Sequence, residues 1–237
     1  MSALLPASIL AASGAAILAR GLLHPRDALF GPILWRTTDP GVALTFDDGP
    51  WPGSTEPILD ALAQAGARAA FFVIGRNALR WPRLVERIHD EGHLVANHTL
   101  DHHRWGTLRH SRYWSLQLDG ASDAVASILS RRPALLRPPM GYRTPFLMRT
   151  ARERSLRVVT WTRRAFDGVP ASLEAIVARA TAARPGDILA LHDGAEPSLH
   201  RKPAPTADAL PEILRRLSGR GLAFPRLDDA LALPAYL

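Results

Sequence analysis

Thr45-Phe46-Asp47-Asp48-Gly49-Pro50, directly after the apolar run Val42-Ala43-Leu44, is the stretch of sequence that decides both fold and chemistry. Further along the chain stands His98-Thr99-Leu100-Asp101-His102. Two imidazoles at this spacing can share one face of a helix or turn, and two adjacent carboxylates can serve different purposes. One carboxylate with two histidines makes an open metal site, in which a divalent ion such as zinc lowers the pKa of a water molecule. The other carboxylate can then act as a base.

These two motifs and the segments between them resemble the polysaccharide deacetylases with a NodB-type domain, the carbohydrate esterases of family 4. The intervening segments that share the resemblance are Ala70-Phe71-Phe72-Val73-Ile74-Gly75 and Glu91-Gly92-His93-Leu94-Val95-Ala96-Asn97-His98. The resemblance extends from Val42 to about Leu233. It implies that Asp48, His98 and His102 hold the metal and that Asp47 is the base. Zinc is the default for such ligands, and cobalt, nickel or manganese are alternatives.

The third motif of the family corresponds to Arg137-Pro138-Pro139-Met140-Gly141-Tyr142. The resemblance implies that Arg137 holds the base and that the backbone amide at Met140 stabilises the oxyanion. Met140 replaces an aromatic residue, which preserves the backbone donor but changes the wall of the sugar pocket. Together with Gly141, Tyr142 is expected to contribute to substrate binding, because its ring could supply part of the missing stacking surface.

The fourth motif is the weakest match, and it reads Trp161-Thr162-Arg163-Arg164-Ala165-Phe166-Asp167-Gly168. Trp161 is expected to contact substrate. Arg164 stands where relatives commonly carry an acid, and Gly168 stands where they carry tryptophan. Asp167 keeps the second acid of the motif and is expected to steer Arg137 or the catalytic histidine. These departures affect the choice of substrate more than the reaction.

The fifth motif is Gly186-Asp187-Ile188-Leu189-Ala190-Leu191-His192-Asp193. The resemblance implies that His192 protonates the leaving amine, a role that suits an imidazole. Leu191 is expected to line the small pocket for the acyl methyl group. Motifs placed at strand ends fit a barrel whose catalytic loops gather on one face.

Apolar runs and helical patterns alternate through residues 42–237. The expected strands are Val42–Leu44, Ala70–Ile74, Leu135–Leu136, Val158–Trp161 and Ile188–Leu191. The expected helices are Glu56–Ala65, Pro82–Asp90, Ser115–Leu129, Leu147–Glu153, Leu173–Ala182 and Ala207–Leu217. This alternation predicts an α/β barrel or a doubly wound sheet, and the family resemblance selects an irregular (β/α)7-type barrel over residues 42–237.

An uncharged stretch from Ala3 to Ala19 precedes Arg20. We interpret residues 1–23 as a signal anchor or transmembrane helix, followed by a linker over residues 24–41. A cleaved signal peptide is a less favoured alternative, because the basic segment that usually starts such a peptide is missing here. A buried or peripheral helix is the other alternative. Arg20, Arg26 and Arg36 favour a cytoplasmic domain by the positive-inside rule. The family usually works outside the cytoplasm, so we expect a membrane-anchored, extracytoplasmic domain.

Composition narrows the class of partner. The chain has 237 residues, 47% of them apolar, which is enough for one sizeable core. It has no cysteine, so disulfides and thiolate zinc ligands are excluded. The net charge of +7 is spread over scattered arginines without a nucleic-acid-binding motif. A membrane surface, a phosphate-bearing glycolipid or an anionic cell-wall polymer suits this charge better than nucleic acid does.

The sequence therefore predicts a metal-dependent hydrolase that removes an N-acyl group, most simply acetyl, from an amino sugar in a polymer or glycoconjugate. One alternative is a deformylase or deacylase of a lipid-linked amino sugar. The other belongs to a different class, a non-catalytic sugar-binding scaffold on the same fold. No obligate protein partner is evident from the sequence.

Overall fold

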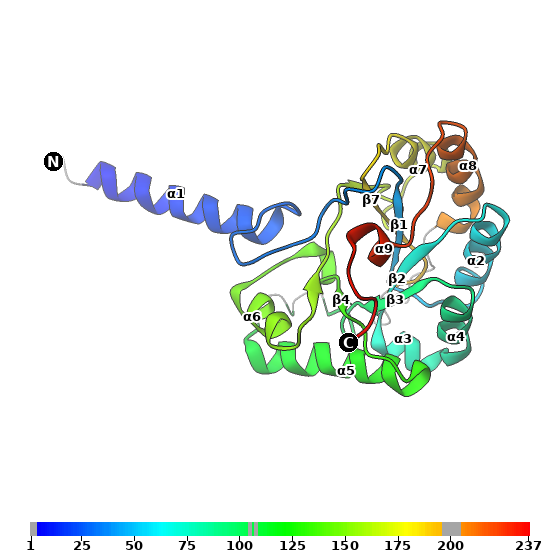
Figure 1. Cartoon of the computed structure of the whole chain (residues 1–237). Helices are drawn as coiled ribbons and strands as arrows, with labels where there is room; N and C mark the ends of the chain where they lie inside the picture. The colour runs from blue at the N-terminus through cyan, green and yellow to red at the C-terminus, as the bar shows by residue number, and fades with distance from the viewer. Residues whose placement is uncertain (1–3, 104–105, 107–108, 196–204) are drawn as a thin grey trace.

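A single parallel sheet organises the molecule (Figure 1). The computed structural model describes residues 4–103, 106, 109–195 and 205–237, with the backbone alone for residues 4–13. Its strands are β1 Ala43–Asp47, β2 Ala69–Val73, β3 Leu94–Asn97, β4 Leu135–Leu136, β5 Arg157–Val158, β6 Arg163–Arg164 and β7 Ile188–His192. They lie in the order β5-β4-β3-β2-β1-β7-β6, and every neighbouring pair is parallel.

Most of the helices lie outside the curled sheet (Figure 1), whereas the last one packs Leu227 against its inner side. Those within residues 42–237 are α2 Thr55–Gln64, α3 Gly75–Arg80, α4 Pro82–Asp90, α5 Ser111–Leu129, α6 Pro145–Glu153, α7 Leu173–Thr181, α8 Thr206–Ser218 and α9 Leu227–Leu231. A helical crossover between parallel strands is the usual connection, because the chain must return to the same end of the sheet. Curled parallel strands with helices outside confirm the predicted α/β class.

The alternation of side chains along β1 separates two environments. Leu44 and Phe46 enter the main apolar core with Ile58 of α2, whereas Ala43 belongs to the inner cluster with Trp161. Successive side chains of a strand point to opposite faces, so Asp47 shares the inner face with Ala43. The strand that buries Phe46 against the helices therefore presents a carboxylate inside the curl.

The sheet is a half-barrel rather than a ring of paired strands. Among the described residues, its edge strands β5 and β6 form no ladder with each other. Residues 34–37 lie between β5 and the start of β7: the Leu34 amide donates to Val158 O at 2.9 Å, and the Thr37 amide donates to Gly186 O at 2.9 Å. These residues belong to the predicted linker over residues 24–41, and in the structure they hydrogen-bond to the sheet.

β3 Leu94–Asn97 is absent from the expected strands, and the observed strands also differ from them at β5 and β6. The apolar run Val158–Trp161 leaves the ladder after Val158, and Val159 pairs instead with Leu34. β6 consists of Arg163 and Arg164, which no apolar run marks as a strand. The differences at β5 and β6 arise from pairing with distant residues, which local hydrophobic patterns do not report.

Helix α1, Leu4–Leu23, extends away from the sheet at the N-terminal end of the described chain (Figure 1). The first three residues of the predicted anchor lie outside the described part. Within the described residues, no helix combines the length and hydropathy needed to cross a membrane.

Candidate metal centre and catalytic site

The polar motifs meet at the carboxyl ends of the parallel strands. Asp47 ends β1 and is in register with His192, which ends the neighbouring β7. His98 follows β3, and Arg137 follows β4. The carboxyl ends of parallel strands share one edge of the sheet, and loops at that edge commonly carry binding groups.

Asp48, His98 and His102 form a compact cluster whose potential ligand atoms all lie within 4.8 Å of one another. Asp48 Oδ1 lies 3.3 Å from His98 Nε2 and 3.4 Å from His102 Nε2. This oxygen is buried, and no hydrogen bond of normal geometry reaches it within the described chain. One carboxylate oxygen facing two imidazole nitrogens fits the ligand set of a divalent metal with open positions.

The charge at this cluster favours an ionised carboxylate. Burial by itself raises the pKa of Asp48, but the neighbouring His102, His98 and His192 outweigh burial and hold the pKa below its usual value. An anionic Asp48 is the form that a metal requires.

The orientation of His98 is set by a backbone group. Its Nδ1 lies 2.7 Å from Arg137 O. A carbonyl oxygen only accepts hydrogen bonds, so Nδ1 must carry the proton and Nε2 presents its lone pair toward Asp48. Such a contact on the outer nitrogen is typical of histidines that ligate metals.

The two histidines lie on an irregular loop after β3, not on a helix. Thr99 and His102 adopt positive φ angles of 68° and 53°. The loop is fixed internally, because Asn97 Oδ1 accepts from the Thr99 amide at 2.8 Å and Thr99 Oγ1 accepts from the His102 amide at 3.2 Å. From α5, Gln117 Oε1 accepts from the amides of residues 100 and 101.

Asp47 forms a buried ion pair with Arg137, whose Nη1 donates to Asp47 Oδ1 at 2.7 Å. The guanidinium has no solvent exposure, and it also donates to Thr45 Oγ1 at 2.8 Å and to Thr160 O at 3.0 Å. It stacks 4.1 Å from the ring centroid of Phe72. Asp47 is thereby held in one orientation beside the Asp48–His98–His102 cluster.

Asp167 pairs with the histidine at the end of β7. Asp167 Oδ1 lies 2.9 Å from His192 Nδ1, and Asp167 Oδ2 accepts from the His192 amide at 2.8 Å and from Thr206 Oγ1 at 2.5 Å. Burial lowers the pKa of His192, but Asp167, together with the nearby Asp48 and Asp47, outweighs burial and raises that pKa to about 10. The sequence predicts that Asp167 steers either Arg137 or the histidine. In the structure Asp167 contacts His192. The proton on Nδ1 faces Asp167, which leaves Nε2 available to a substrate.

The turn of the third motif packs against Trp161. Gly141 has φ +70°, and a Cβ placed there would lie 2.5 Å from Trp161 Cη2. Met140, with φ 56°, has 36% of its surface exposed. Tyr142 is half-buried, and its ring makes no aromatic contact within the described chain. The fourth motif adds Arg164, whose guanidinium lies 5.2 Å from the Trp161 ring centroid.

Leu191 is placed differently from the expectation. It is fully buried in the outer core with Phe46 and Leu189, on the opposite face of β7 from His192. Ala190 lies in the inner cluster with Trp161. Alternation along the strand puts Ala190, two residues before His192, on the catalytic face, so Leu191 does not line an acyl pocket.

Asp193 is a buried carboxylate to which the sequence analysis gave no role. It accepts from Thr55 Oγ1 at 2.7 Å and lies so close beneath Gly49 that a Cβ there would come within 2.0 Å of Asp193 Oδ2. Burial raises the pKa of Asp193 to about 7. Its position directly after the catalytic-face histidine of a buried strand was the available signal. Asn77, to which the sequence also assigned no role, fixes the backbone of Asp48, because its Nδ2 donates to Asp48 O at 2.8 Å.

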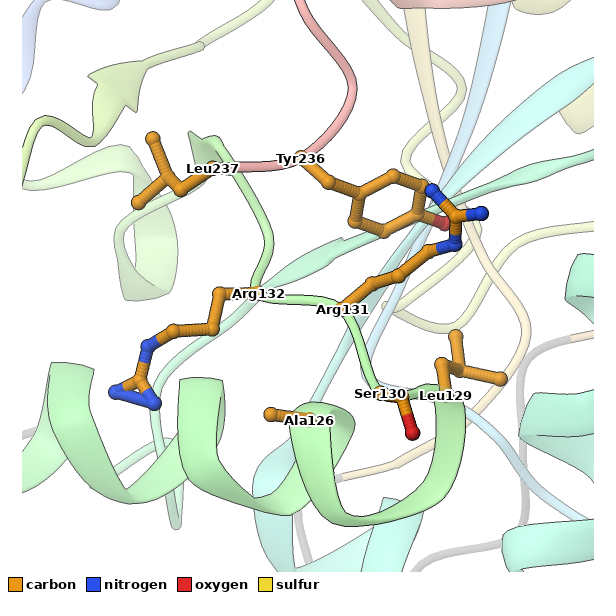
Figure 2. Close-up of a pocket in the computed structure, with 7 residues that line it drawn as sticks. All are labelled: Ala126, Leu129, Ser130, Arg131, Arg132, Tyr236 and Leu237. Atoms are coloured by element: carbon orange, nitrogen blue, oxygen red, sulfur yellow. The ribbon is translucent and has the colours of Figure 1, made fainter.

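A separate hollow of about 550 Å³ lies at the opposite edge of the sheet (Figure 2). Arg131 and Arg132, which line it, precede β4, so the hollow lies at the amino ends of the strands. The remaining lining residues are Ala126, Leu129, Ser130, Tyr236 and Leu237. None of the motif residues contributes to it.

Comparisons with known proteins agree with this geometry. The sequence profile of a family described as polysaccharide deacetylase matches residues 36–159. A peptidoglycan-N-acetylglucosamine deacetylase of Bacillus cereus is 34% identical over 193 residues, covering 80% of this chain and 87% of the relative. A chitooligosaccharide deacetylase of a Bradyrhizobium species is 38% identical over 162 residues, covering 68% of this chain and 74% of the relative.

Solved structures share the architecture. A family 4 carbohydrate esterase from Streptomyces lividans, in complex with acetate, superposes with a TM-score of 0.71 at 33% identity. The match covers 81% of this chain and 94% of that one. A peptidoglycan N-acetylglucosamine deacetylase superposes with a TM-score of 0.78 at 28% identity, over 86% and 94% of the two chains.

Metal binding should stabilise the fold through Asp48. We expect added Zn²⁺ to raise the melting temperature of the wild type, since a ligand at 100 times its Kd stabilises by ~2.7 kcal/mol. Asp48→Asn, which keeps the shape but loses the charge, should lose most of this rise in differential scanning fluorimetry. Asp101→Asn is the matched control, because Asp101 lies in the same loop and pairs with Arg76 at 3.9 Å. Equal shifts for Asp48→Asn and wild type would contradict the assignment.

The Asp167–His192 pair should make stability depend on pH at the alkaline end. Because the folded pKa of His192 is raised to about 10, the pair stabilises fully below the unfolded pKa of ~6.5, and this contribution is lost as pH rises through the folded value. Asp167→Asn should lower the pKa of His192 in an NMR titration and reduce the loss of stability between neutral and alkaline pH. An unchanged His192 titration in this variant would show that another group sets the pKa.

Proposed function

This chain belongs to the polysaccharide deacetylase family, and we propose that it removes the N-acetyl group from amino sugars of a cell-wall-type polymer, releasing acetate and a free amine. The curated relatives named above act on peptidoglycan N-acetylglucosamine and on chitooligosaccharides. The observation that carries the proposal is the convergence of Asp47, the Asp48–His98–His102 cluster and His192 at one edge of the sheet.

Asp48, His98 and His102 would hold a divalent metal, for which zinc is our first choice. When bound, the ion supplies Lewis acidity and lowers the pKa of a water molecule. Two neutral imidazoles and one carboxylate also suit cobalt, nickel or manganese. The absence of cysteine from the chain leaves nitrogen and oxygen ligands only.

The chain's own residues then divide the proton transfers. Asp47, fixed by Arg137, takes a proton from the attacking water. The backbone amide of Met140 donates to the oxygen that becomes negatively charged, an interaction worth roughly 3–4 kcal/mol in other enzymes. His192 gives the proton on Nε2 to the leaving nitrogen, and Asp167 stabilises its charged form.

A deacylase of an anionic, lipid-linked amino sugar is the second candidate. Arg164 occupies a position that is commonly acidic in the family, and its guanidinium stacks on Trp161 and on Phe166. Gly168 removes the tryptophan that closes the motif in relatives, and a Cβ placed there would lie 3.2 Å from His192 Cε1. An added cation and a smaller side chain favour a larger, negatively charged substrate. A non-catalytic scaffold is less favoured, because every role in the reaction has an occupant.

The direct test is acyl release from N-acetylglucosamine oligomers, peptidoglycan fragments and a formylated lipid-linked amino sugar. We expect metal-loaded wild type to release acetate, and Asp47→Asn to be slower by a factor of ~10²–10⁴, the usual contribution of a general base. Asp101→Asn should retain activity. Release that does not depend on Asp47 would contradict the mechanism. Failure on every substrate with metal bound would favour the scaffold.

We further propose that residues 1–23 tether the protein to a membrane, with the catalytic domain outside the cytoplasm. The uncharged stretch from Ala3 to Ala19 and the exposed side chains of Ile17, Leu18 and Leu23 support this proposal. We expect the full chain to sediment with membranes and Ile17→Glu/Leu18→Glu to be partly released. Protection of the domain from protease added to intact spheroplasts would instead place it in the cytoplasm.

A further inference from the structure

Arg143 is a buried arginine that holds backbone carbonyls instead of a carboxylate. Only 1% of its surface is exposed. Nη1 donates to Gly141 O at 2.9 Å, and Nη2 donates to Gly21 O at 2.9 Å and to His24 O at 2.5 Å. Its own amide donates to Leu22 O at 3.3 Å. Burying a charge costs free energy unless hydrogen bonds compensate it. The Arg143 guanidinium therefore stays buried only while the three carbonyls remain within its reach.

These carbonyls belong to two segments far apart in sequence. Gly21 and Leu22 lie in the last turn of α1 and His24 directly follows the helix, where carbonyls lack partners within the helix and the dipole favours a cation. Gly141 belongs to the turn of the third motif. Arg143 therefore caps α1 and fastens the end of that helix to the catalytic edge of the sheet.

Further contacts fix the same N-terminal segment to the opposite wall of the site. Thr160 Oγ1 donates to Pro25 O at 2.5 Å, and Arg26 Nη2 donates to Thr162 O at 3.0 Å. These residues flank Trp161, against which Gly141 packs. Residues 21–26 thus contact both the third-motif turn and the segment between β5 and β6 that carries Trp161.

The turn needs such support. Met140 and Gly141 adopt consecutive positive φ angles of 56° and 70°. For a non-glycine residue this conformation costs of order 1–3 kcal/mol and persists only where the surroundings fix it. Two side chains fix this turn: Trp161 fills the space beside Gly141, and Arg143 donates to the Gly141 carbonyl.

We propose that Arg143 is a positioning residue, which uses the end of α1 as a second anchor to hold the Met140–Gly141 turn in the geometry that aims the Met140 amide at the oxyanion. The inference rests on the proposed function, in which that amide stabilises the oxyanion. Displacement of the end of α1 is then transmitted to the catalytic turn through one guanidinium.

The first test compares Arg143→Met and Arg143→Lys with the wild type on soluble N-acetylglucosamine oligomers. Arg143→Met should lower kcat by about tenfold or more, below the ~10²–10³ lost when an oxyanion donor is removed outright, with little change in KM. Arg143→Lys should be intermediate, because an ammonium keeps the charge but cannot span the same carbonyls. A variant that only loosened the fold would lower the melting temperature and leave kcat per folded molecule unchanged.

Arg154→Met is the matched control. Arg154 follows α6, is half-buried and donates to both carboxylate oxygens of Asp119 at 2.6 and 2.7 Å, with no contact to the turn. It should lose some stability and keep its kcat. Equal effects of Arg154→Met and Arg143→Met on kcat would overturn the proposal.

A double-mutant cycle tests the coupling to α1. A Cβ at Gly21 would lie 2.6 Å from Leu29 Cδ2, so Gly21→Leu should displace the end of the helix. We expect it to lower kcat, and we expect the double variant Gly21→Leu/Arg143→Met to be no worse than Arg143→Met, because both changes break the same connection. Additive losses would show that the two sites act independently.

Hydrogen exchange decides the inference without any substrate. In Arg143→Met, amides in residues 20–27 and 139–144 should exchange faster together, while Arg154→Met leaves both segments as in the wild type. Unchanged exchange in Arg143→Met overturns the connection. A wild type that releases no acyl group from any substrate overturns the proposed function, and exchange still reports on the connection.

Discussion

The ion pair between Arg137 and Asp47 is the constraint on which the rest of the site depends. The guanidinium is fully buried, and its two terminal nitrogens donate to Asp47, Thr45 and the Thr160 carbonyl. The backbone carbonyl of the same residue orients His98. One residue therefore orients the Asp47 carboxylate through its side chain and the His98 imidazole through its main chain. Removing one partner of such a buried pair typically costs about 3–5 kcal/mol.

The parallel sheet allows the same strands to carry both the apolar core and the polar site. Strand alternation sends Leu44, Phe46 and Leu191 outward into the helix-covered core, and it sends Asp47 and His192 inward at the same edge. The apolar face supplies the stability that offsets buried charge on the inner face. Threonines complete the polar network, since Thr45 Oγ1 also donates to Leu189 O at 2.8 Å and links β1 to β7.

Much of this site could be predicted from the sequence, because its chemistry lies in short motifs at strand ends. The prediction that Leu191 lines the acyl pocket was wrong, because it was taken from the motif alone. Side chains alternate along β7, so Ala190, and not Leu191, shares the inner face with His192. β6 could not be predicted, since two arginines carry no apolar signal. The contacts of Arg143 with residues 21 and 24, and of residue 34 with β5, join distant parts of the chain. Hydrophobic periodicity reports the face of an element, but it does not report which distant backbone will meet it.

Residues 34–37 have a consequence for the behaviour of the protein at high concentration. An edge strand with unpaired amides and carbonyls is a template for strands of other molecules. Here the Leu34 amide donates to Val158 O at 2.9 Å, and the Leu34 carbonyl accepts from the Thr160 amide at 2.8 Å. The segment thus acts as a guard against intermolecular strand addition at β5. The same short stretch also pairs with Asp187 at the start of β7, so one segment of backbone both covers the edge at β5 and joins the two ends of the curled sheet.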